Sequence, residues 1–112
     1  MLDKKKLIIK TIEDKLASDI KVIDFNNVSP FYDYFIICTS LNDRMNRSIC
    51  KNVEKTAKEN NIIINSIEVS NDGGWSLIDL DDIVIHVFSK QQRELYALES
   101  LWKDLPIEEI HE

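Results

Sequence analysis

The stretch from Gly74 to Phe88, GWSLIDLDDIVIHVF, constrains the fold more than any other part of this 112-residue chain. Two runs rich in apolar and β-branched residues, 75–80 and 83–88, flank the dipeptide Asp81-Asp82. A connection this short joins antiparallel strands, because parallel strands need a crossover of about a dozen residues or more. The sequence therefore predicts a β-hairpin with a two-residue turn.

Pairing across that turn sorts the side chains of the hairpin onto two faces, since successive residues of a strand point to opposite sides. One face is nearly all apolar and pairs Leu80 with Ile83, Ile78 with Ile85, and Ser76 with Val87. The other mixes aromatic, apolar and ionisable groups and pairs Trp75 with Phe88, Leu77 with His86, and Asp79 with Val84. The first face is core. The second is either core with a buried polar pair or a recognition surface.

Two constellations of chemical interest lie on the hairpin. Asp79 and His86 are diagonal neighbours, and a structural pair in which Asp79 orients the histidine is the simplest interpretation. Ser76 points to the opposite face, so no Ser-His-Asp triad follows. Asp79 and Asp81 have the spacing of two carboxylates that hold a metal for phosphoryl transfer. A Gly-Ser phosphate loop would be expected just before these carboxylates, but bulky Trp75 separates Gly74 from Ser76 there. Acidic residues are also common at turns for conformational reasons.

The rest of the chain supplies helices and further strands. Apolar spacing of about four residues predicts helices over 4–17, from Asn42 or Asp43 to 60, and over 91–102. Strands are expected at 20–25, 34–39 and 62–69, the second buried on both faces and central, with a turn at Asn71-Asp72-Gly73-Gly74 before the hairpin. The order α-β-β-α-β-β-β-α predicts one mixed α/β domain, residues 1–105, built on a mixed five-stranded sheet. Residues 106–112 are expected to form an acidic tail.

Composition limits the classes of function. The net charge is −6, which disfavours binding of nucleic acid by the whole surface. Basic residues nevertheless recur along the second helix at Arg44, Arg47, Lys51, Lys55 and Lys58, as a local basic face or a plain solvated surface. Without a signal-peptide pattern or about 18 consecutive apolar residues, we expect a soluble cytosolic protein that binds no membrane. Cys38 and Cys50 fit reduced core thiols better than a metal site.

An ordered set of motifs resembles the Iojap family of ribosomal silencing factors. The motifs are Asp33–Thr39, Gly74–Asp79, Asp82–Phe88, Arg93–Tyr96 and Leu98–Trp102. The resemblance implies a nucleotidyltransferase-like fold without transferase activity or cofactor, often in a homodimer. It further implies binding to the fourteenth protein of the large ribosomal subunit, a steric block to joining of the small subunit, and repression of translation when nutrients are short. Direct sequence-specific binding of nucleic acid is not expected.

The resemblance also suggests which residues meet the partner. Trp75, Leu77, Ile78 and Asp79 match the family's tryptophan-containing strand, and His86 matches the next strand. An aromatic anchor beside a carboxylate suits a protein hot spot. Trp75 is equally readable as a core residue, and Asp81 stands where the family has a turn glycine. Two alternatives to a ribosomal factor stay open, a metal-dependent nucleotidyltransferase using Asp79 and Asp81 and a dimeric scaffold.

Overall fold

The centre of the sheet consists of β2 (Tyr34–Ser40) and β5 (Ile83–Ser89), which run parallel to each other in the computed structural model. The structure describes residues 3–70 and 74–111, and within them the sheet has six strands in the order β3-β4-β5-β2-β1-β6. All pairs other than β2 with β5 are antiparallel. The remaining strands are β1 (Ser18–Asp24), β3 (Ser66–Glu68), β4 (Trp75–Asp79) and β6 (Ile107–Glu109).

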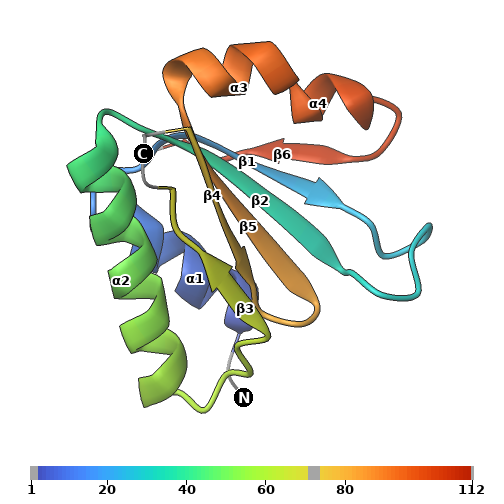
Figure 1. Ribbon diagram of the computed structural model, residues 1–112. Coiled ribbons are helices and arrows are strands. Elements are labelled where there is room, and N and C mark those ends of the chain that lie inside the picture. The colour runs from blue at the N-terminus through green and yellow to red at the C-terminus, as the bar shows by residue number, and fades with distance from the viewer. Residues whose placement is uncertain (1–2, 71–73, 112) are drawn as a thin grey trace.

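Helices cover both faces of this sheet (Figure 1). One face carries α1 (Lys4–Glu13) and α2 (Asp43–Glu59), and the other carries the short α3 (Lys90–Tyr96) and α4 (Leu98–Leu101). Asn42 caps α2 by accepting a 2.8 Å hydrogen bond from the Met45 N–H, which satisfies one of the free donors at that end. The predicted mixed α/β class and the central place of β2 are thus confirmed.

Each face of the sheet has its own core. The larger core packs α1 and α2 on the strands, with Ile8, Ile12, Ile49, Val53, Ile78 and Ile85 at 0 % exposure. The smaller lies under α3 and α4 and contains Ile23, Phe25, Ile37, Phe88 and Leu98. Cys38 and Cys50 are buried free thiols, as predicted, and burial raises the pKa of Cys38 to about 12. In the described part of the chain, no helix is both long and apolar enough to cross a bilayer.

The prediction of five strands was wrong. Ile107–Glu109, expected in an acidic tail, form β6 and pair with β1. Two lysines neutralise this segment, because Lys5 lies 3.2 Å from Glu108 and Lys21 lies 3.7 Å from Glu109. A three-residue strand at a sheet edge has too little alternation to be recognised in sequence.

Three other boundaries differ from the prediction. The first helix, predicted over 4–17, ends at Glu13. Leu16, which continues its four-residue apolar spacing, is 73 % exposed at φ 64°. The last helix is broken at Ala97, which adopts a left-handed φ of 45°. The strand predicted over 62–69 shrinks to Ser66–Glu68. Of the turn predicted at residues 71–74, residues 71–73 lie outside the described residues.

Candidate protein interface

The hairpin of β4 and β5 has the predicted register. Leu77 pairs with His86 and Asp79 with Val84, and the Leu80 N–H donates a 2.9 Å hydrogen bond to the Ile83 carbonyl to close the two-residue turn. Asp81 takes a left-handed φ of 81° there, a conformation that Asp tolerates better than most residues. The turn is fixed from outside by Lys4, whose ammonium group contacts the Leu80 carbonyl at 2.6 Å and pairs with Asp82.

The apolar face of the hairpin is core and takes no part in a surface. Ile78 has 0 % exposure beneath the helices, so its predicted contact with a partner is wrong in this fold. Ser76 is equally buried, and its hydroxyl donates to the side-chain oxygen of Asn46. The Asn46 amide group in turn donates to the Val87 carbonyl at 3.2 Å and the Ser40 hydroxyl at 3.3 Å. This buried hydrogen-bond network around Asn46 was not predicted from the sequence.

The opposite face of the hairpin is partly open. α3 packs on β5 and β2, and Figure 1 shows β3 and β4 at the margin of the sheet without a helix of their own on this side. Trp75, Leu77 and Asp79 lie here in a row on β4, partly exposed. Exposed Glu68 pairs with Leu77 across β3, and Tyr96 at the end of α3 is 50 % exposed. We call Trp75, Leu77, Asp79, Glu68 and Tyr96 the hairpin face.

Trp75 is held rigidly on this face while part of it stays accessible. Its ring centroid lies 4.9 Å from that of Phe88, 4.8 Å from Tyr96 and 5.7 Å from His86. Its indole N–H donates a 3.1 Å hydrogen bond to His86 Nδ1. One side of the half-buried Trp75 ring therefore packs in the core and the other side stays accessible. The two interpretations, core residue and surface anchor, are compatible.

His86 supports Trp75 from below and is itself buried. The imidazole is 4 % exposed, with the Phe35 ring centroid 4.8 Å away. Burial lowers the pKa of His86 to about 4, so the ring is neutral at pH 7. Because Nδ1 accepts the hydrogen bond from Trp75, the proton of the neutral ring resides on Nε2, which has no hydrogen-bond partner within the described residues. His86 thus positions Trp75 and offers almost no surface to a partner.

The predicted pairing of Asp79 with His86 was wrong, because Asp79 is engaged at the turn. Its carboxylate accepts a 2.9 Å hydrogen bond from the Asp81 N–H, and the Asn65 side-chain amide lies 3.4 Å from it. The same amide donates to the Asp81 carboxylate at 3.2 Å. Asn65 therefore bridges the two carboxylates that the transferase alternative requires. The described residues contain no cluster of three or more His, Cys, Asp or Glu arranged to hold a metal ion.

Sequence reasoning missed the contribution of Tyr96 to this face. Helical spacing within the helix predicted over 91–102 favours packing roles for both Tyr96 and Trp102. Trp102 does pack, with its ring 5.2 Å from both Phe25 and Phe35. Tyr96 instead reaches across to Trp75 because α3 ends there and Ala97 redirects the chain. The positive φ of an alanine has no sequence signal from which this could have been predicted.

The chemistry of this arrangement is suited to binding a partner. A rigid aromatic anchor, an apolar neighbour and two carboxylates, Asp79 and Glu68, form one continuous surface strip. Such a surface suits a protein partner that offers an apolar pocket beside Lys or Arg side chains.

Comparison with known proteins agrees with this fold. A family model described as "Ribosomal silencing factor during starvation" matches residues 1–112. The chain is 36 % identical over 105 residues to the Bacillus subtilis protein named ribosomal silencing factor RsfS, covering 94 % of this chain and 89 % of that protein. It is 26 % identical over 102 residues to the maize chloroplast protein Iojap, covering 90 % of this chain and 44 % of that one. A crystal structure of a Bacillus halodurans protein superposes with a TM-score of 0.81 at 33 % identity, covering 95 % and 96 % of the two chains.

Proposed function

The chain belongs to the RsfS family of ribosomal silencing factors, and from that premise we propose that it binds the large ribosomal subunit through that subunit's fourteenth protein. Bound there, it blocks joining of the small subunit and represses translation when nutrients are limiting. It acts in the cytoplasm, where the subunits are, and uses no cofactor. The hairpin face supplies the contact.

The observation that supports this proposal best is that the Trp75 side chain is held in a fixed position. Its hydrogen bond to His86 and its packing against Phe88 and Tyr96 fix the ring before any partner arrives. A side chain that is already ordered loses little conformational entropy on binding, which favours it as an anchor. Tryptophan is among the residues that most often dominate protein interfaces.

Charge complements this anchor. Asp79 and Glu68 flank Leu77, and the whole chain carries a net charge of −6. Ribosomal proteins must neutralise RNA and are therefore rich in Lys and Arg. Opposite charges of this kind raise the rate of encounter and orient the two partners.

Co-sedimentation with isolated large subunits tests the proposal. We expect binding at low micromolar concentration in moderate salt, and a loss of at least about 30-fold in affinity for Trp75→Ala, because a hot-spot residue contributes about 2 kcal/mol or more. Leu77→Ala should also weaken binding, and it should disturb the core less than Trp75→Ala does. Leu101→Ala is the matched control, because Leu101 is 68 % exposed outside the hairpin face.

Circular dichroism separates loss of binding from loss of folding in these variants. If Trp75→Ala unfolds the chain, Leu77→Ala still decides the question. Wild-type protein that fails to sediment with large subunits, or Leu77→Ala that binds as Leu101→Ala does, would contradict the proposal. A pull-down of the purified fourteenth protein tests the named partner. Light scattering after gel filtration tests the homodimer that the family resemblance implies.

A further inference from the structure

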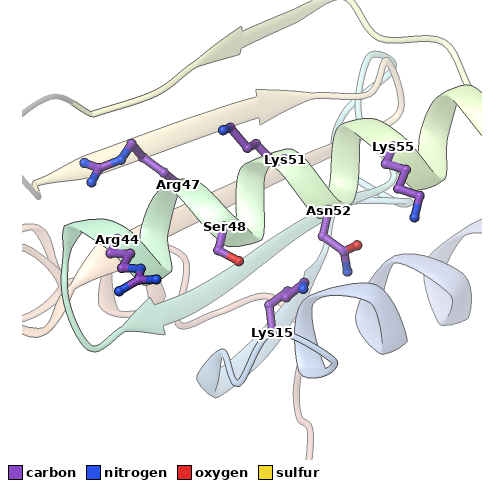
Figure 2. A pocket seen from close by; sticks show the side chains of 7 residues that line it. All are labelled: Lys15, Arg44, Arg47, Ser48, Lys51, Asn52 and Lys55. Carbon is purple, nitrogen blue, oxygen red and sulfur yellow. The ribbon is translucent and has the colours of Figure 1, made fainter.

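A second surface of opposite charge lies on the other side of the molecule, along α2. A groove of about 450 Å³ between α2 and the end of α1 is lined by Lys15, Arg44, Arg47, Ser48, Lys51, Asn52 and Lys55. We call these seven residues the basic groove (Figure 2). Five of them are cations and none is acidic, although acidic residues outnumber basic ones by 20 to 14 in the chain.

The cations of this groove form no ion pair within the part of the chain that the structure describes. All five are exposed. Among the cations that do not line the groove, Lys4, Lys5, Lys21, Lys58 and Arg93 form such pairs, and Lys6, Lys10, Lys90 and Lys103 form none with a described residue. Glu54, an acidic residue of the same helix, forms an ion pair with Lys58 at 3.5 Å. A run of positive charge that the protein leaves unneutralised is available to an external anion.

The floor of the groove is firmly built. The Asn52 side-chain amide donates a 3.0 Å hydrogen bond to the Thr11 carbonyl and so ties α2 to α1. The Thr11 and Thr56 hydroxyls lie 3.4 Å apart one turn further along. Figure 2 shows Lys15 reaching toward Asn52 from the end of α1, with the cations of α2 arrayed around Ser48 and Asn52. The position of Lys15 relative to the cations of α2 is therefore set by the fold.

The shape of this charge indicates a linear polyanion. Arg44, Lys51 and Lys55 recur at helical spacing, and the twelve residues from 44 to 55 extend about 16 Å along α2. Successive charges of a nucleic-acid strand are about 3.4 Å apart along the duplex axis, so this length matches several phosphates rather than one. A compact anion such as a free phosphate would leave most of the row unused.

The residue types indicate contact with the backbone of the nucleic acid and not with its bases. No aromatic side chain lines the groove, and base recognition in single strands depends on stacking with aromatic rings. Lys, Arg, Ser and Asn side chains are the usual ligands of phosphate and sugar oxygens. We propose that the basic groove binds the phosphodiester backbone of RNA without sequence preference. The choice of RNA over other polyanions rests on the proposed ribosomal function.

Fluorescence anisotropy with a labelled mixed-sequence RNA strand of about 20 nucleotides tests this proposal on the full chain. Five phosphate contacts predict a slope of about −3.5 in log K against log salt, or about 100-fold weaker binding at 200 mM than at 50 mM salt. The triple variant R47Q/K51Q/K55Q retains two groove cations, so its affinity should fall only about 7-fold over the same range. It should also bind more weakly than wild type at low salt.

The matched control is K10Q/K90Q/K103Q, which changes the net charge equally at three exposed lysines outside the groove. Wild-type affinity and slope in this control, together with their loss in the groove variant, support the proposal. Equal weakening in both variants, absence of RNA binding by wild type, or tighter binding of a poly-glutamate probe than of RNA would overturn it. Co-sedimentation of the same variants with large subunits is scored separately. RNA binding that depends on the groove without subunit binding would refute the ribosomal function alone, and the converse result would refute the groove alone.

Discussion

Acidification should destabilise this protein through one buried histidine. His86 is 4 % exposed on the underside of Trp75, and burial lowers its pKa from 6.5 to about 4. In the unfolded chain the same imidazole is solvated and regains its ordinary pKa. Between these two pKa values the unfolded state binds a proton that the folded state does not.

The sign and size of the effect follow from that difference. Stability is complete above about pH 6.5, falls as the pH drops toward 4, and loses nothing further from this group below pH 4. The full difference of about 2.5 pKa units corresponds to about 3 kcal/mol, and the loss between pH 7.5 and pH 5 is about 2 kcal/mol. For a domain with a free energy of unfolding of about 5–15 kcal/mol, this is a large fraction.

Urea denaturation followed by tryptophan fluorescence at pH 7.5, 6 and 5 measures the effect. His86→Asn keeps an acceptor near the position of Nδ1 for the Trp75 N–H but cannot titrate, so its stability should be lower yet nearly constant over this range. His111→Gln is the control, since His111 is exposed near the C-terminus and its replacement should leave the wild-type loss intact. A wild-type change below about 0.5 kcal/mol, or an equal loss in His86→Asn, would refute the reasoning.

Two further predictions concern the folded core and its backbone. Asn46→Ala should lower the free energy of unfolding by about 2–3 kcal/mol in urea denaturation, because it leaves the Ser76 hydroxyl and the Val87 carbonyl without their buried partner. Asn60→Ala, at the exposed end of α2, is the control. A loss for Asn46→Ala no larger than that for Asn60→Ala would contradict the buried role of Asn46. Ala97→Gly should raise the free energy of unfolding by about 1 kcal/mol, because φ at this position is 45° and glycine avoids the steric cost of Cβ. Thermal denaturation checks the second prediction, and destabilisation would show that the left-handed conformation is not the one in solution.

The hairpin could be predicted in detail because two independent constraints agree. The turn length fixes which residues face each other, and the alternation of Ile78, Leu80, Ile83 and Ile85 fixes which face is buried. A shift of one residue would have moved that whole set to the opposite face of the sheet. The buried positions of α2, Ile49, Val53 and Ala57, follow from their helical period in the same way.

The polar side chains were harder to predict, because each had several partners within reach. Asp79 and His86 are diagonal neighbours, but the backbone N–H of Asp81 is nearer to Asp79 and the indole N–H of Trp75 reaches His86. Register alone cannot rank these competing hydrogen bonds. Likewise Leu16 and Ala97 take left-handed conformations that their types disfavour, so tertiary packing decides where α1 and α3 end.

The two proposed surfaces differ in charge, and this difference determines how they can cooperate. The hairpin face joins an aromatic anchor to carboxylates, while the basic groove holds five cations that pair with no other described residue, along α2 and just after α1, the helices that cover the opposite side of the sheet. Because one chain carries both, each contact raises the effective concentration of the other, and two modest affinities can give firm binding. The dependence of binding on salt concentration distinguishes the contribution of the basic groove from that of the hairpin face. Screening weakens the groove steeply, whereas burial of the Trp75 ring depends little on ionic strength, so the contact that survives at high salt is that of the hairpin face.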